Sequence, residues 1–211
     1  MVVPIPLMEM PTPGCVEAGG RLYRINSGFR TGILLCRLLE DDEVDESLKP
    51  FFALRLYYPE IPDDMDSALE RIGWFYRCGE EISGGEGPGG VERRCYSFDC
   101  DADYIYAAFM QQYGIDLHTA RLHWWSFQAL FSSLSDDCLF TKIVGWRRAE
   151  ITRDMTDEQR SFLYSMKHAF ALPENRADSE LERVLMHGGC CGGIRIDPPD
   201  GHAKADKNQR R

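Results

Sequence analysis

Apolar residues recur at the spacing of an α-helix along most of this chain. From residue 29 onward, large apolar side chains return every three or four positions, and Gly, Pro and acidic runs divide the pattern into segments. Most of these segments are long enough for a helix that buries one face. The pattern predicts helices over residues 29–39, 48–58, 66–78, 101–113, 116–134, 136–151 and 157–171, with a short further helix over 179–187.

One stretch near the N-terminus alternates like a β-strand instead. Residues 16–25 include Tyr23 and Ile25, and Gly19-Gly20 stands in the middle of the stretch. Two glycines between two such runs favour a tight turn. The sequence therefore predicts a mainly α fold, as a single helical domain with a short N-terminal β-hairpin.

Several predicted helices carry end signals. Gly79 and Gly114 follow apolar segments and are typical C-terminal stops, because glycine adopts the left-handed conformation that ends many helices. Asp116 is placed as the N-cap of the helix after Gly114. Thr156 and Gln159 have the spacing of a capping box.

The predicted helix that begins at Asp116 is the most informative segment. At 100° per residue most of its apolar residues gather on one stripe, which we assign to the core: Leu117, Ala120, Trp124, Phe127, Leu130, Phe131 and Leu134. Trp125 must point well away from Trp124, and Leu122 and Ala129 share its side. Such a helix is covered on two sides, either by its own domain or by another chain. Leu122, Trp125 and Ala129 are therefore the candidate partner-contact residues.

Composition divides the chain into a domain and two ends. Residues 1–14 are predicted to be a flexible lead-in, residues 15–173 the helical domain, and residues 174–211 a short helix with a disordered tail. Residues 83–90 are rich in glycine. A phosphate cradle would need a preceding strand, a following helix start and usually a Lys with Ser or Thr. The stretch is therefore predicted to be a flexible surface loop.

A group of motifs follows in close succession through the middle of the chain. They are YIYAAF at 104–109, YGIDL at 113–117, LHWWSF at 122–127 and KIVGWR at 142–147. In these motifs the chain resembles the bacteriophage "gene product fifteen" family, encoded among the tail genes of phages of Gram-positive bacteria. It departs from the family pattern before Phe29-Arg30, where Ser27-Gly28 replaces an acidic residue. The resemblance implies a role in building a phage tail and supplies no catalytic or ligand residues.

Charge and hydropathy narrow the class of protein. Of the 211 residues, 44% are hydrophobic and 11% aromatic, which is typical of a globular chain. The formal net charge of −10 argues against a general nucleic-acid binder, which needs a basic surface. No segment is apolar and long enough to span a bilayer, and the N-terminus lacks the features of a signal peptide. We therefore expect a protein of the host cytoplasm that binds neither nucleic acid nor membrane, with its eight cysteines reduced.

The cysteines and histidines do not have the spacing of a metal site. Structural zinc usually needs two close ligand pairs. Cys95 and Cys100 could form one pair, but no second pair of that form follows. The sequence predicts no metal and no cofactor, although the candidate ligands are Cys78, Cys95, Cys100, His187, Cys190 and Cys191.

No local pattern indicates catalysis. The chain has no nucleophile motif such as Gly-x-Ser-x-Gly, and His118 and His123 are interpreted as structural or solvent-facing. The many Asp and Glu residues are interpreted as helix caps and acidic loops, because negative charge is favourable at helix starts. Arg147 and Arg148 are interpreted as cations that stabilise a helix C-terminus. The protein is predicted to be non-enzymatic, with no catalytic residues.

The favoured hypothesis, which rests on the resemblance, is a phage or prophage tail morphogenesis protein that acts as a tail assembly chaperone. Its partners would be the tape-measure protein and tail-tube or other tail assembly proteins. Such a chaperone would cover apolar helical faces of the tape-measure protein until tail-tube subunits polymerise on it. The alternatives are a structural component retained in the virion tail and, in third place, a host-directed enzyme or nucleic-acid factor.

Overall fold

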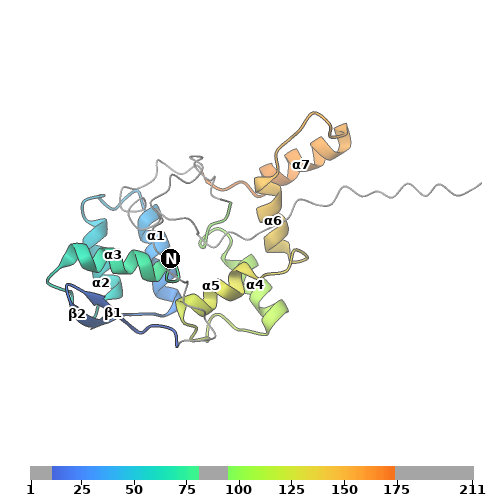
Figure 1. Cartoon of the computed structure of the whole chain (residues 1–211). Helices are drawn as coiled ribbons and strands as arrows, with labels where there is room; N and C mark the ends of the chain where they lie inside the picture. The colour runs from blue at the N-terminus through green and yellow to red at the C-terminus, as the bar shows by residue number, and fades with distance from the viewer. Residues whose placement is uncertain (1–10, 81–94, 174–211) are drawn as a thin grey trace, which may run out of the picture.

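The computed structural model describes residues 11–80 and 95–173, and it has the mainly α fold that the sequence predicts (Figure 1). The lead-in before residue 11, the glycine-rich stretch 83–90 and residues 174–211 lie outside the described residues. In chain order the elements are β1 Cys15–Ala18, β2 Arg21–Arg24, α1 Phe29–Glu40, α2 Lys49–Tyr57, α3 Met65–Tyr76, α4 Ala102–Tyr113, α5 Trp124–Ser132, α6 Leu139–Arg148 and α7 Asp157–Ala169.

Strands β1 and β2 form the predicted hairpin. They pair antiparallel, with Val16 opposite Tyr23. Gly19 and Gly20 make the turn with φ angles of 55° and 77°, which glycine adopts without the steric penalty of a Cβ. The backbone N–H of Gly19 donates to the Ser67 hydroxyl at 3.0 Å, so the hairpin is attached to the start of α3.

The first three helices and α5 share one core. Helix α1 packs on α2 and on α5, while α2 packs on α3. The helices predicted over residues 29–39, 48–58 and 66–78 are confirmed to within two residues at each end. The helical spacing that predicted α1 also selects the residues that it buries: Phe29, Gly32, Leu35, Cys36 and Leu39.

Trp124 is the largest fully buried side chain of this core. Its indole N–H donates to the carbonyl of Tyr76, the last residue of α3, at 2.8 Å, and the two rings stack with centroids 5.0 Å apart. The six-membered ring of the indole lies directly on Gly32. A Cβ at that position would be only 2.2 Å from Cε3 of Trp124. Glycine at position 32 is therefore what allows α5 to approach α1 this closely.

Phe127 extends this contact to α4. Its ring stacks on Phe29 of α1, on Phe109 of α4, and on Trp124 and Phe131 of its own helix, with centroid distances of 5.0, 5.2, 5.8 and 5.7 Å. Stacked rings bury large apolar areas and add a favourable quadrupole interaction. Three helices that are distant in the sequence are thus joined through one side chain.

The helix predicted from Asp116 begins only at Trp124, so this part of the prediction is wrong. The carboxylate of Asp116 accepts from the N–H of His118 at 2.9 Å and closes a single turn. The guanidinium of Arg30 then binds three carbonyls at 2.8–2.9 Å, those of Leu117, His118 and Ala120. In a helix these carbonyls would accept from N–H groups four residues later. Because Arg30 occupies them, the chain remains a loop up to residue 123.

Backbone hydrogen bonds join this loop to the start of α1. The N–H of Phe29 donates to the carbonyl of Leu122 at 3.0 Å, and the N–H of Trp124 donates to the carbonyl of Ser27 at 2.8 Å. Helices α1 and α5 therefore begin side by side, which brings Trp124 to Gly32.

The end signals read from the sequence are otherwise accurate. Gly114 ends α4 with a left-handed φ of 64°. After α3, Cys78 and Gly79 both have positive φ, and Gly79 donates its N–H back to the Trp74 carbonyl at 2.9 Å. Thr156 opens α7 with a capping box in which the Gln159 N–H donates to the Thr156 hydroxyl at 3.2 Å.

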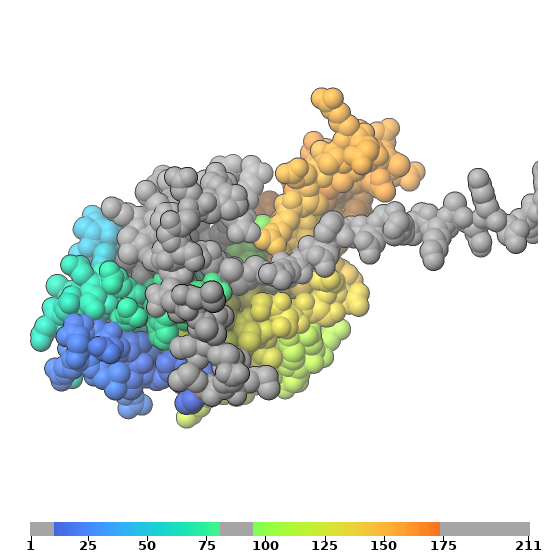
Figure 2. Space-filling model, viewed as in Figure 1, coloured from blue at the N-terminus to red at the C-terminus, as the bar shows by residue number. Residues whose placement is uncertain are grey.

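Helices α6 and α7 lie on the far side of α4 from the hairpin. Helix α6 packs on α4, and α7 packs on α6. In the space-filling view the orange segment that contains α7 stands clear of the rest of the described chain (Figures 1 and 2). Trp146 joins the two helices, because its ring packs edge-on against Phe162 of α7 with centroids 6.1 Å apart and stacks on Phe170, the residue after α7, at 5.5 Å.

Substitution of Gly32 by alanine should destabilise the protein strongly. The added methyl group would overlap the buried indole of Trp124, and overpacking of this kind commonly costs about 1–3 kcal/mol, more where the neighbour cannot move. Chemical denaturation of the full chain measures the loss.

A second background tests the cause of that loss. In Trp124→Leu the indole is absent, so the added methyl group no longer overlaps it. Gly32→Ala should then cost little stability in this background, because alanine is also favoured over glycine inside a helix. Gly28→Ser is the matched control, because nothing lies within 4 Å of a Cβ at position 28. An equal cost of Gly32→Ala in both backgrounds would contradict the contact.

Candidate functional site

Trp125, the central residue of the predicted partner-contact patch, is buried. Only 4% of its surface is exposed, and its indole N–H donates to the Phe75 carbonyl at 2.8 Å. Its ring packs edge-on against Trp74, with centroids 5.6 Å apart, and one ring carbon lies 3.1 Å from where a Cβ on Gly79 would be. The chain's own α3 therefore covers the second side of α5.

Leu122 and Ala129 do not extend Trp125 into an exposed surface. Leu122 lies in the loop before α5 and is half-buried, with its carbonyl bonded to α1. Ala129 is on α5 and is exposed. The expectation that Leu122, Trp125 and Ala129 share one side of a continuous helix is wrong because the helix starts at Trp124. Trp125 is not accessible as an aromatic anchor for a partner.

His123 is the N-cap of α5. Its Nδ1 accepts from the N–H of Trp125 at 3.1 Å, so the neutral ring carries its proton on Nε2 and donates it to the Pro13 carbonyl, 3.0 Å away. Burial lowers the pKa of His123 below its ordinary value, and the hydrogen bond to Pro13 offsets only part of this effect. Both ring nitrogens are thus occupied by backbone groups.

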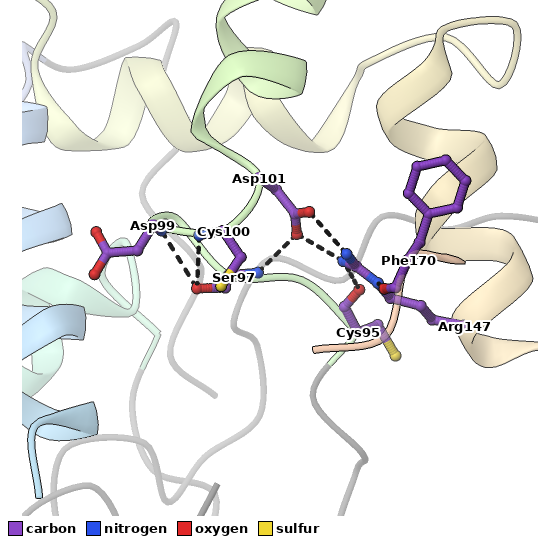
Figure 3. A network of polar contacts seen from close by, with 7 residues as sticks. All are labelled: Cys95, Ser97, Asp99, Cys100, Asp101, Arg147 and Phe170. Atoms are coloured by element: carbon purple, nitrogen blue, oxygen red, sulfur yellow. Dashed lines mark hydrogen bonds and ion pairs between the residues drawn. The ribbon is translucent and has the colours of Figure 1, made fainter. Parts of the chain in front are cut away.

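A buried ion pair joins α6 to the start of α4 (Figure 3). The guanidinium of Arg147 donates from both terminal nitrogens to the carboxylate of Asp101, at 2.6 and 2.8 Å. The Asp101 side chain is 1% exposed and that of Arg147 is 10% exposed. The same carboxylate accepts from the N–H of Ser97 at 2.9 Å. A two-pronged Arg–carboxylate pair of this kind is geometrically specific.

Arg147 also binds two carbonyls outside its own helix. Its Nε donates to Phe170, beyond α7, at 2.6 Å, and Nη1 donates to Cys95 at 3.1 Å (Figure 3). Our interpretation of Arg147 as a cation that stabilises the helix C-terminus was incomplete, because the side chain links three segments. Since every nitrogen of the guanidinium is used in this way, we assign the network a structural role.

The described residues hold no group of three or more His, Cys, Asp or Glu side chains arranged to bind a metal ion. Cys95 is half-buried and Cys100 exposed, and neither forms a disulfide within the described residues. His187, Cys190 and Cys191 lie outside the described residues. No helix within residues 11–80 and 95–173 has the length and apolar character needed to cross a bilayer.

Helix α2 exposes phenylalanine and buries lysine. Phe51 is 49% exposed and Phe52 is 43% exposed, and their rings meet edge-on with centroids 5.9 Å apart. Lys49 is only 1% exposed, because its ammonium group donates to the Leu39 carbonyl at 2.9 Å and pairs with Glu46. The usual distribution of these residue types is the reverse.

The exposed side of α2 is an apolar stripe. Leu48, Phe51, Phe52 and Arg55 follow one another at i, i+3, i+4 and i+7, all of them exposed, and we call this set the α2 stripe. The opposite side of the helix buries Ala53, Leu54 and Tyr57. A helix that is apolar on both sides is normally covered on both sides. Sequence reasoning missed this surface, although the uninterrupted apolar run at residues 50–54 was a readable signal.

The sequence profile of the bacteriophage Gp15 protein family matches residues 8–172. The chain belongs to this family. The match includes both strands and all seven described helices, so the whole described fold is the family's domain. Membership confirms the family indicated by the motifs and identifies the chain as a phage protein. No curated protein and no solved structure matches it.

Replacing Trp125 should destabilise the fold about as much as replacing Trp124. Trp125→Phe removes the indole N–H and leaves the Phe75 carbonyl with only the N–H of Cys78, 3.1 Å away, so the lost hydrogen bond should cost about 0.5–1.5 kcal/mol. The control is Trp146→Phe, because the Trp146 indole N–H has no hydrogen bond partner within the described chain. Thermal and denaturant melts of the two variants measure the difference in stability. A Trp125→Phe variant as stable as the Trp146→Phe control would argue against a stabilising hydrogen bond from Trp125 to Phe75.

Protonation of His123 should make the protein less stable in mild acid. The folded-state pKa of His123 is lowered, so as the pH falls below about 6.5 the unfolded chain takes up a proton before the folded chain does. This contribution to stability is therefore present above pH about 6.5 and is lost as the pH falls through the folded-state pKa. Unfolding curves between pH about 7.5 and 5.5 measure the slope. In His123→Asn, which keeps an N-cap acceptor, the slope should be shallower, and an unchanged slope would exclude His123 as its source.

Proposed function

We propose that this protein is a tail assembly chaperone that binds an apolar helical segment of the tape-measure protein through the α2 stripe. Two findings support the proposal. The chain belongs to a phage protein family whose motifs we associate with tail genes, and it displays an apolar surface on a helix that is already buried on its other side.

The α2 stripe is the observation that carries the proposal. Single exposed apolar residues are ordinary on protein surfaces. Here three large apolar side chains, those of the N-cap Leu48 and of Phe51 and Phe52, lie together at the start of one short helix and are 48%, 49% and 43% exposed. Contiguous apolar surface of this kind is typical of a protein-binding site.

The geometry of the stripe suits a helical ligand. Side chains at i, i+3, i+4 and i+7 form a ridge along one side of a helix, and a second amphipathic helix can place its own ridge beside it. Apolar faces of the tape-measure protein would be exposed to water until tail-tube subunits polymerise around it. Covering such a face with Phe51 and Phe52 would keep the segment soluble.

We further propose that the role is non-enzymatic and is carried out in the host cytoplasm, without nucleic acid or membrane as a partner. The buried polar network of Asp101 and Arg147 is fully occupied by bonds that join segments of the fold. The net charge of −10 is unfavourable for general binding to nucleic acid.

The double substitution Phe51→Gln, Phe52→Gln should weaken binding to the tape-measure protein and leave folding intact. Both side chains are about half exposed, so their loss costs the fold little, whereas loss of aromatic anchors typically weakens binding by about 2 kcal/mol or more, which is about thirtyfold. Titration calorimetry with purified tape-measure fragments measures the affinity. Tyr164→Gln, which removes an exposed aromatic ring from α7, is the control.

If the double variant binds the tape-measure protein with wild-type affinity, the α2 stripe is not the binding site. Absence of binding by the wild-type protein would reject the chaperone role itself. Mass spectrometry of purified virions separates the remaining possibility, because stoichiometric presence of the protein in the particle would indicate a structural component.

A further inference from the structure

The outer edge of β2 borders an open groove. A hollow of about 560 Å³ runs beside the strand, and its far wall comes from α1 and from the segment between α2 and α3. The lining residues used below are Arg21, Arg24, Ser27, Thr31 and Glu60. Leu22, on the same strand, is 69% exposed. In Figure 1, β2 lies at the lower left, on the opposite side of the molecule from α7.

The backbone of β2 has unused hydrogen-bonding groups on this edge. The N–H of Ile25 donates to the Gly14 carbonyl at 3.0 Å, so these two residues form a hydrogen-bonded pair. In an antiparallel ladder such pairs alternate with pairs whose backbone groups point outward. Leu22 and Arg24 therefore direct their N–H and C=O groups away from β1. Over the described residues no hydrogen bond reaches them.

Positive charge collects around the same edge. A second hollow of about 340 Å³ shares Ser27 and Gly28 with the first and is lined by Arg30 and Arg121. Together the two hollows have four arginines and one carboxylate, that of Glu60, which already faces Arg21 at 3.6 Å. Arg24 and Arg121 have no hydrogen bond or ion-pair partner among the described residues.

The start of α1 adds to this positive potential. Helix α1 has Gly28 as its N-cap, with no side-chain cap and no acidic residue in its first turn. The partial positive charge of a helix N-terminus is then not compensated by its own sequence. In a chain with a net charge of −10, the linings of these two hollows therefore carry a net positive charge, with Glu17 of β1 as the nearest acidic residue across the ladder from Leu22.

We propose that β2 binds an extended, acidic segment of a partner protein as a third strand of the hairpin. The ligand backbone would bond to the outward N–H and C=O groups of Leu22 and Arg24, as in other cases of strand addition. Acidic side chains on the same face would meet Arg24, and those beyond the strand end would reach Arg121. About five residues of ligand, roughly 17 Å at 3.3 Å per residue, pair with one such strand.

The charges disfavour a second copy of this chain as the ligand. Pairing of β2 with β2 of another copy through the same outward groups would bring the two Arg24 side chains opposite or diagonal to each other, and like charges on neighbouring strands are destabilising. The outward backbone groups distinguish an acidic peptide from a nucleic acid, because only a peptide backbone can continue the ladder. This site uses neither Phe51 nor Phe52, so it is independent of the function proposed for the α2 stripe.

The test uses fluorescence anisotropy with the full chain and a labelled ten-residue peptide that alternates Glu and Thr. We expect saturable binding that weakens several-fold between about 50 and 500 mM salt, because exposed charges are screened. Arg24→Glu should weaken binding at least tenfold, and Arg121→Glu by a smaller factor. Arg153→Glu, an exposed arginine in the loop between α6 and α7, is the matched control and should bind as the wild type does.

Three comparison ligands give the alternative outcomes. The same peptide with Lys in place of Glu should not bind. The acidic peptide with alternate backbone nitrogens methylated should lose most of its affinity, because one edge of its ladder is blocked. A ten-nucleotide oligothymidylate should bind more weakly than the acidic peptide. No binding of the acidic peptide, equal binding of the methylated peptide, or tighter binding of the oligothymidylate would each overturn the proposal.

Discussion

The helical body depends on how two adjacent tryptophans close the end of α3. Trp124 and Trp125 donate their indole N–H groups, both at 2.8 Å, to the consecutive carbonyls of Tyr76 and Phe75. Neither carbonyl has the usual helical donor four residues later, although that of Phe75 also accepts from the N–H of Cys78 at 3.1 Å. Adjacent residues of a helix point about 100° apart, so both indoles reach α3 only if α5 starts at one place and at one angle. Gly32 then permits α1 to lie against the indole of Trp124. The end of α3, the middle of α1 and the start of α5 are thereby fixed relative to one another.

The second half of the described chain is held by a different kind of contact. Asp101 and Arg147 form a buried pair whose remaining bonds reach Ser97, Cys95 and Phe170. Burying an ion pair gains little net free energy over apolar packing, but removing one partner leaves a buried charge and is strongly destabilising. This pair therefore specifies where α6 and the end of α7 are attached more than it adds to stability. Both joints lie away from the α2 stripe, so substitutions on that stripe can be tested without disturbing either.

The sequence predicts the elements better than the contacts between them. The hairpin turn, the end of α4 and the capping box of α7 each depend on residues a few positions apart, so local chemistry determines them. The late start of α5 depends on Arg30, which is some 90 residues away from the carbonyls that it binds, and no local pattern contains that information. Trp125 could only be a candidate partner contact for the same reason, since a helical projection of α5 does not show whether α3 of the same chain or another chain covers it. The burial of Lys49 beside an exposed Phe51 likewise results from tertiary packing that overrides residue type.

The two surfaces proposed here have opposite chemistry, and this determines how they would act together. The α2 stripe is apolar, so contact with it is insensitive to screening and is strengthened by salts that are excluded from protein surfaces. The groove beside β2 is basic, so an acidic ligand there is held by a force that falls as ionic strength rises. A partner that offers an apolar helix and an acidic extended segment on one chain would gain from both, because binding of the first segment raises the effective concentration of the second. Such a partner would remain bound at salt concentrations at which the acidic segment alone dissociates, because its apolar segment still holds it. Two separate partners would instead respond to salt in opposite directions, and a single salt series on the full chain distinguishes these arrangements.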